Sequence, residues 1–151
     1  MINAAVFGAG RIGKGHTHNI ASLPGIALRY VVDVNPVAAS ELAGVYGAKP
    51  ATIEAALGDS EIHAVVIATS TDTHADLIQR AAAAGKAIFC EKPVDLALER
   101  ARLCAEAVTK AGVLCGIGFQ RRFDPTFAAL KTRLDNGEIG EPETLLITSR
   151  E

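Results

Sequence analysis

Residues 2–13 read Ile2-Asn3-Ala4-Ala5-Val6-Phe7-Gly8-Ala9-Gly10-Arg11-Ile12-Gly13, a short apolar run that leads directly into G-x-G-x-x-G. A strand before these glycines and a helix after them form the context in which the spacing indicates a dinucleotide-binding turn. In such a turn Gly8 permits the tight bend, Gly10 lets the backbone approach a pyrophosphate, and Gly13 lets the helix pack closely on the strand. The alternative is a glycine turn that serves packing alone.

An acidic residue, Asp33, follows Gly13 by 20 residues and closes the apolar run Ile26–Val32. A carboxylate there can accept hydrogen bonds from the adenosine ribose, and it would repel the additional phosphate of NADP. The sequence therefore favours NAD, although neighbouring arginines could offset the repulsion. Asp33 could instead only cap the following helix, but Asn35 before Pro36 already fits that role.

Composition restricts the class of protein. Of the 151 residues 49% are hydrophobic and 21% charged, with a formal net charge of −2, which argues for a globular chain and against binding to nucleic acid or an anionic membrane. No apolar run approaches the roughly 20 residues of a membrane helix, and no signal segment precedes the first strand. We therefore expect a cytoplasmic protein.

The three cysteines are Cys90, Cys104 and Cys115, and no two of them form a C-x-x-C pair. They are predicted to be reduced, mostly buried thiols. We expect no metal site, because the His and Cys residues lack the spacing of ligands.

Strand and helix patterns alternate along the chain, which predicts an α/β fold with a doubly wound parallel sheet, the Rossmann NAD-binding fold. The run 64–68 is apolar without alternation and fits a central strand, whereas Pro50 restricts its short strand to an edge. Both fit the strand order 3-2-1-4-5-6. The expected strands are residues 2–7, 27–33, 48–51, 64–68, 86–90 and 113–118.

Helix ends are predicted from capping residues. Thr73 with Asp76 resembles a capping box, and Asp95 is placed to cap the helix that ends near Gly112. Asp124 before Pro125 opens a further helix.

A strand-like run at residues 144–148 follows the sixth strand, where it has nothing to pair with. We therefore expect the chain to be the N-terminal part of a longer protein. Residues 1–120 would be the dinucleotide-binding domain. Residues 121–151 would be a junction helix and the first strand of a second domain that binds substrate.

Glu91-Lys92-Pro93 follows directly on the fifth strand. Ligands of open α/β sheets bind at the carboxyl ends of the strands, so Lys92 is predicted to face the nicotinamide end of the crevice. A lysine there can hydrogen-bond a substrate hydroxyl and help to shuttle its proton, or it can stabilise the alkoxide charge that develops during hydride transfer. The alternative is a surface lysine beside a loop proline.

Four motifs occur in order along the chain: Gly8–Gly13, Ala68-Thr69-Ser70-Thr71-Asp72-Thr73-His74, Glu91-Lys92-Pro93 and Gly118-Phe119-Gln120-Arg121-Arg122-Phe123-Asp124-Pro125. Together they resemble the glucose–fructose oxidoreductase/inositol dehydrogenase/MocA family, and within it the inositol 2-dehydrogenase type, over essentially the whole chain. Ser70 and Gln120 depart from the family pattern, in which proline and asparagine are common.

The resemblance implies roles for single residues. Lys92 matches the catalytic lysine and Glu91 the residue that orients it, while Arg122 matches a position near the cofactor. His74 belongs to the turn that lines the cofactor, although a catalytic base stays an alternative for it. The residues expected to bind the cofactor are Gly8, Gly10, Arg11, Ile12, Gly13, Asp33, Thr69, Ser70, Thr71, His74, Glu91, Lys92 and Arg122.

The resemblance also implies an activity: NAD-dependent oxidation of a ring hydroxyl of a cyclitol or sugar by hydride transfer to nicotinamide. In the family a second domain supplies an aspartate and a histidine to the active site, and the full-length proteins are homo-oligomers. The partner expected here is a small polyol substrate. The alternative is a truncated NAD-binding module without catalytic competence.

Overall fold

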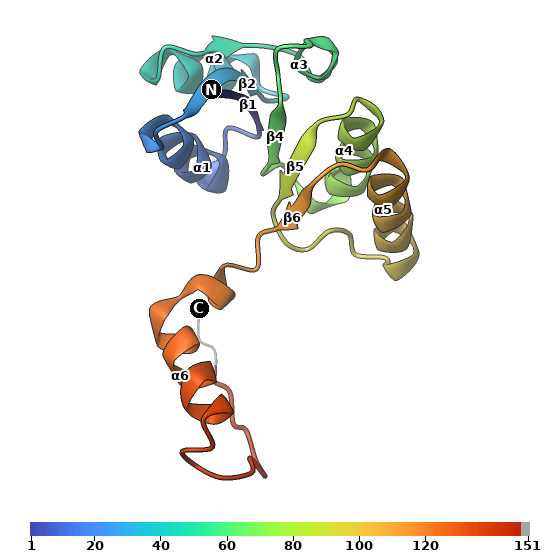
Figure 1. The fold of residues 1–151 in the computed structure, drawn as a ribbon. Helices are drawn as coiled ribbons and strands as arrows, with labels where there is room; N and C mark the ends of the chain where they lie inside the picture. Colours follow the sequence, from blue (N-terminus) through green and yellow to red (C-terminus); the bar gives the residue numbers. More distant parts are fainter. Residues whose placement is uncertain (149–151) are drawn as a thin grey trace. The chain divides into compact units, whose positions relative to one another are not determined.

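Six short runs of mainly apolar residues form one parallel sheet in the order β3-β2-β1-β4-β5-β6 (Figure 1). This is the doubly wound order expected from the sequence, with the Pro50 strand at one edge. The computed structural model describes residues 1–148. The strands are β1 (Ile2–Phe7), β2 (Ile26–Val32), β3 (Lys49–Pro50), β4 (Ala64–Ile67), β5 (Ala87–Cys90) and β6 (Cys115–Ile117).

The chain divides into two compact units, Met1–Gly118 and Phe119–Glu151. The first contains the sheet and five helices: α1 (Arg11–Ser22), α2 (Pro36–Val45), α3 (Ile53–Gly58), α4 (Thr71–Ala83) and α5 (Leu98–Ala111). The second contains the 3₁₀ turn η1 (Gln120–Phe123) and α6 (Pro125–Asp135), whose first N–H groups are capped by Asp124 as expected.

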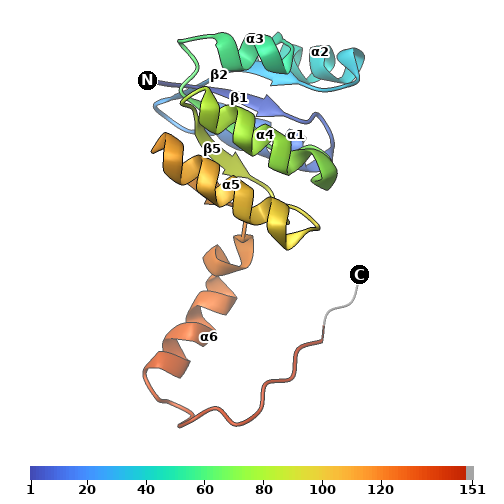
Figure 2. The same ribbon diagram turned by 90° about the vertical axis from the view of Figure 1, so that its right-hand side faces the viewer.

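Helices cover both faces of the sheet, with α1 on one side and α4 and α5 on the other (Figures 1 and 2). Alternate residues of a strand point to opposite faces. Ala4 and Val6 therefore cluster with Ile20 of α1, whereas Ala5 and Phe7 join the apolar side chains of α3, α4 and α5. The central strand β4 is covered on both faces, as its unbroken apolar run predicts.

At the carboxyl edge of the sheet the backbone ladder continues one residue beyond the strands. The bonds are Gly8 N–H to Val32 C=O (2.7 Å), Ala68 N–H to Phe7 C=O (2.8 Å), Glu91 N–H to Ile67 C=O (2.9 Å) and Gly118 N–H to Cys90 C=O (2.8 Å). The loops after β1, β4, β5 and β6 thus begin in one row.

Two glycines close the first of these loops. Gly8 has φ +105°, which L side chains rarely adopt, and a Cβ on it would lie 2.4 Å from the Ala68 carbonyl oxygen. A Cβ on Gly13 would lie only 1.8 Å from the carbonyl oxygen of Gly8. The start of α1 therefore packs directly on the turn, as expected for the third glycine of the motif.

Residues 144–148 pair with none of the described residues, and Leu145, Leu146 and Ile147 are exposed. The strand of a second domain that we expect there stays a prediction. Two local expectations about helix caps were wrong. The Thr73–Asp76 capping box does not form, because α4 begins two residues before Thr73. The capping residue before α5 is Ala97, and Asp95 instead accepts the Ala97 N–H at 2.9 Å. The chain's last residues, 149–151, lie outside the described residues.

Substitution of Gly13 by alanine is expected to destabilise the chain by about 1–3 kcal/mol, because backbone must move to admit the Cβ. Gly15→Ala, on the same helix, is the matched control. A Cβ at Gly15 meets nothing within 4 Å, so alanine should stabilise by about 0.5–1 kcal/mol through helix propensity. Urea unfolding of both variants measures the difference, and equal midpoints would contradict the packing argument.

The cysteines are expected to differ in reactivity. Cys90 and Cys104 are buried and Cys115 is exposed, and burial raises the pKa of the Cys90 thiol to about 12. At pH 8 iodoacetamide should therefore label Cys115 at least about tenfold faster than Cys90. Peptide mass spectrometry reads the rates, with the chain in guanidinium as the control in which all three react. Equal rates in the folded chain would show that the carboxyl end of β5 opens to solvent.

Candidate cofactor and active site

The N-terminus of α1 offers free backbone donors. Its capping residue is Gly10, no side chain caps its first N–H groups, and its first turn carries no acidic residue. Such a helix start attracts an anion through its N–H groups and its dipole. A Cβ on Gly10 would meet nothing within 4 Å, so there is open space in front of this backbone. The turn fits a bound pyrophosphate.

Asp33 holds the glycine loop in place. Its Oδ2 accepts the Ala9 N–H at 2.7 Å and its Oδ1 accepts the Asn35 N–H at 2.8 Å. The α2 helix is capped by Asn35, whose side chain accepts from Val37 and Ala38, so capping is not the role of Asp33. An ionised carboxylate has about four acceptor positions, which leaves capacity for the hydroxyls of a ribose.

Two adjoining clefts open at this edge of the sheet. One, of ≈ 590 Å³, is lined by seven of the residues predicted to bind the cofactor. The other, of ≈ 550 Å³, lies beside β2 and β3 and has mainly apolar walls, including Pro36, Ala39 and Ile53. Asp33 and Thr69 line both clefts, so a ligand can extend from one into the other. The seven residues are Gly8, Gly10, Arg11, Ile12, Asp33, Thr69 and Ser70.

An ion pair at the clefts was not expected from the sequence. Arg80 Nη2 lies 2.8 Å from Glu54 Oε1, and Arg80 lines one cleft while Glu54 lines the other. The hydrogen bond from Arg80 holds the pKa of Glu54 below its usual value. Sequence gave no signal for this pair, because 26 residues separate its members.

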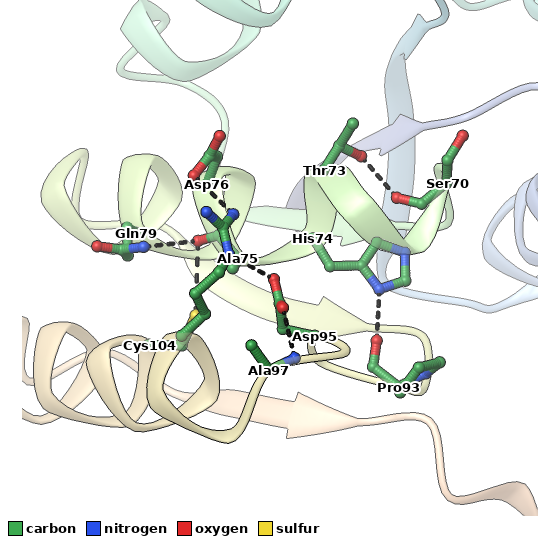
Figure 3. A network of polar contacts seen from close by, with 11 residues as sticks. Ser70, Thr73, His74, Ala75, Asp76, Gln79, Pro93, Asp95, Ala97 and Cys104 are labelled. Carbon is green, nitrogen blue, oxygen red and sulfur yellow. Dashed lines mark hydrogen bonds and ion pairs between the residues drawn. The ribbon is translucent and has the colours of Figure 1, made fainter.

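The turn after β4 is stabilised by its own polar side chains. Thr69 Oγ1 and Thr73 Oγ1 lie 2.7 Å apart, and the Thr73 hydroxyl donates to the Ser70 carbonyl at 2.8 Å. His74 is only 2% exposed. Its Nδ1 lies 2.8 Å from the Pro93 carbonyl oxygen (Figure 3). Its Nε2 lies 3.1 Å from the carbonyl oxygen of Thr69. The ring is therefore buried between two backbone segments.

Lys92 lies in the loop after β5, where it is exposed. Within residues 1–148 it forms no ion pair. Its peptide bond to Pro93 is cis. The preceding residue, Glu91, accepts a hydrogen bond from His16 of α1, with Oε1 and Nε2 2.8 Å apart. His16 was missed by the sequence analysis, although it borders the buried helix stripe of Gly13, Thr17 and Ile20.

The loop that contains Lys92 is fixed again at Asp95. Asp95 accepts the Ala97 N–H and, at 2.8 Å, the Nε of Arg100, whose Nη2 lies 3.2 Å from Asp76 of α4. These hydrogen bonds hold the pKa of Asp95 below its usual range, and the bond from the Ala97 N–H has the largest effect. Figure 3 shows Asp76, Asp95 and Ala97 in this network beside His74 and Pro93.

Not all predicted residues line the clefts. Gly13 is buried behind the glycine turn, and Thr71, His74, Glu91 and Lys92 do not line the two clefts described above. Arg122 lies in η1 of the second unit, so its role near the cofactor stays a prediction. The described part of the chain holds no cluster of three or more potential metal ligands. None of its helices is both long and apolar enough to cross a membrane.

Comparison with known proteins agrees with the geometry of the glycine turn. The model of the GFO_IDH_MocA family, described as an oxidoreductase family with an NAD-binding Rossmann fold, matches residues 2–119. An inositol 2-dehydrogenase of Rhizobium meliloti is 49% identical over 150 residues, which are 99% of this chain and 46% of that protein. A scyllo-inositol 2-dehydrogenase (NAD⁺) of Bacillus subtilis is 43% identical over 94% of this chain and 42% of its own length.

A solved structure is similar in its fold as well. Scyllo-inositol dehydrogenase of Lactobacillus casei, with bound NAD(H) and scyllo-inositol, has a TM-score of 0.88 and 28% identity over 93% of this chain and 43% of its own. The chain thus spans less than half the length of these relatives. The glycine turn, the strand order and the family match lead to one conclusion: the chain belongs to the GFO_IDH_MocA oxidoreductase family and carries its NAD-binding Rossmann fold.

Proposed function

We propose that this chain is the cofactor-binding part of a dehydrogenase of the inositol 2-dehydrogenase type, which oxidises a ring hydroxyl of a cyclitol or sugar. The observation that carries the proposal is the position of Lys92. Cys90 pairs with Ile67 in the sheet register, so the loop with Lys92 starts level with the turn of Thr69, which lines the cofactor cleft. A cationic side chain thus lies one strand away from the cleft.

The chain's own residues have distinct tasks in this proposal. The N–H groups at the start of α1 bind the pyrophosphate, and Asp33 binds the adenosine ribose. The Lys92 ammonium donates a hydrogen bond to the oxygen of the substrate hydroxyl and stabilises the negative charge that develops there as the hydride leaves. The hydroxyl proton would pass to the histidine that the substrate domain supplies. Bound NAD would supply the hydride acceptor.

The relatives support the substrate class, because proteins described as inositol dehydrogenases match nearly the whole chain. Since the chain covers less than half of them, we assign residues 1–120 to the cofactor domain and residues 121–151 to the beginning of a substrate domain. That domain would supply the aspartate and histidine that complete the site. The competing proposal is an NAD-binding module that does not turn over substrate, and turnover of inositol by the full-length protein decides between the two.

Lys92→Ala in the full-length protein is expected to lower kcat for inositol oxidation by about 10²–10³-fold, because the negative charge that develops on the substrate oxygen loses its cationic hydrogen-bond donor. The affinity for NAD should change little. NADH formation gives kcat, and calorimetric titration gives the affinity for NAD. Lys110→Ala, at an exposed lysine in the last turn of α5, is the matched control. Turnover of Lys92→Ala equal to that of Lys110→Ala would refute the catalytic role.

Asp33→Asn is expected to raise the affinity ratio of NADP to NAD by about tenfold or more, because a like charge beside the additional phosphate is removed. Asparagine keeps an acceptor oxygen for one of the two backbone N–H groups that Asp33 binds. Asp33→Ala should shift the ratio in the same direction but also weaken NAD binding, since both N–H groups lose their acceptor. Paired calorimetric titrations measure both ratios. An unchanged ratio in Asp33→Asn would exclude Asp33 as the discriminating residue.

A further inference from the structure

Histidine contacts flank Lys92 on both sides. The preceding residue, Glu91, contacts His16 of α1, and the following residue, Pro93, contacts His74 of α4. Both helices begin at the cofactor clefts: α1 at the glycine turn and α4 at the turn of Thr69. Lys92 is therefore the one residue between two attachments, and each attachment leads to a different cofactor loop.

The contact of His74 is buried and has two acceptors. A carbonyl oxygen can only accept a hydrogen bond. Both ring contacts are therefore hydrogen bonds when both ring nitrogens carry a proton, and only one contact is a hydrogen bond when the ring is neutral. At 2% exposure the ring has no access to water that could replace either bond. A buried polar ring costs free energy unless it is hydrogen-bonded, and here its two contacts link the backbone of Thr69 to that of Pro93.

The contact of His16 is confined by its surroundings. The ring packs edge-on against Phe89 of β5, with 5.2 Å between the ring centroids. Gly118, directly after β6, lies close to the same carboxylate: a Cβ on Gly118 would lie 3.0 Å from Glu91 Oε1. The side chains of His16 and Glu91 are about four-fifths buried, at 21% and 20% exposure. The Glu91 carboxylate is thus held between α1 and the end of β6.

We propose that His16 and His74 are positioning residues that hold the backbone on either side of Lys92 and so tie the placement of its ammonium to the two loops of the cofactor cleft. This inference rests on the proposed catalytic role of Lys92. Lys92 is exposed and forms no ion pair within residues 1–148, so the direction of its side chain depends on the backbone from which it projects. Neither histidine needs to touch substrate or cofactor.

A double-mutant cycle in the full-length protein tests the proposal. His16→Leu and His74→Leu should each lower kcat for inositol oxidation by about tenfold to hundredfold, as expected when a catalytic group is misplaced by about 1 Å. In a Lys92→Ala background the same substitutions should cause no further loss, because there is no ammonium left to position. His16→Gln and His74→Gln, which keep one donor each, should recover part of the rate.

The control is His18→Leu, an exposed histidine on the same helix, which should leave kcat unchanged. If His16→Leu and His74→Leu lower kcat equally with and without Lys92, they support the fold only and the proposal is overturned. If Lys92→Ala itself leaves turnover intact, the catalytic role of Lys92 is refuted. That single variant therefore distinguishes a failure of the proposed function from a failure of the positioning role of the histidines.

A measurement without substitutions covers the case in which a leucine variant does not fold. Proton–nitrogen NMR spectra of the histidine rings should show a hydrogen-bonded proton on His74 Nδ1. Addition of NAD should shift the ring signals of both His16 and His74, since each is attached to a cofactor loop. His63, which accepts the N–H of Asn3 at the opposite edge of the sheet, should not shift. Unshifted His16 and His74 signals at saturating NAD would overturn the proposal.

Discussion

The register of the parallel sheet determines where every loop of the site begins. Phe7, Val32, Ile67 and Cys90 are aligned across neighbouring strands, and the residue after each of them continues the row. Backbone hydrogen bonds fix that row whatever side chains follow. The glycine turn, the carboxylate of Asp33, the turn of Thr69 and the loop of Lys92 are therefore side by side before any ligand contact is considered. A shift of one strand by one residue would misplace its loop and also turn each of its side chains to the other face of the sheet.

Close backbone packing on one side of the glycine turn leaves open space for a ligand on the other side, at Gly10. The backbone at Gly8 lies against Ala68, and α1 lies against Gly8, so that neither position has space for a Cβ. Gly10 is the opposite case, with nothing within 4 Å of a Cβ. Asp33 ties the same turn to the end of β2 through the Ala9 N–H. The result is a rigid helix start whose N–H groups remain available, which is what binding of a phosphate requires.

Much of the fold and of the cofactor edge was predictable from the sequence, because the sequence patterns that indicate them are local. Periodicity and turn residues predicted the strand order, and the spacing from Gly8 to Asp33 predicted the cofactor edge. The contacts that the sequence did not reveal are tertiary, whereas the two wrong helix caps are local. The apolar run at 144–148 has the composition of a strand, and none of the described residues pairs with it. The pairs Glu54–Arg80 and His16–Glu91 join residues 26 and 75 positions apart, and no pattern within one helix reveals them. Asp95 is a residue type that often caps helices, yet it lies before the capping position of α5. There it accepts hydrogen bonds from the Ala97 N–H and from Arg100 of α5.

Each of the two links beside Lys92 joins residues that are far apart in the sequence, and the geometry of histidine suits both links. Each link must run from a helix that begins at a cofactor loop to the loop after β5, and it ends on a carboxylate in one case and on a carbonyl in the other. Imidazole is rigid, has two opposed nitrogens and can donate from either. At His74 one ring therefore spans two backbone segments, which a longer flexible donor would do only with a greater loss of side-chain entropy. At His16 the ring also packs on Phe89, so burial and hydrogen bonding fix Glu91 together. In the proposal, the placement of the Lys92 backbone then follows from α1 and α4, the helices that begin at the glycine turn and at the turn of Thr69.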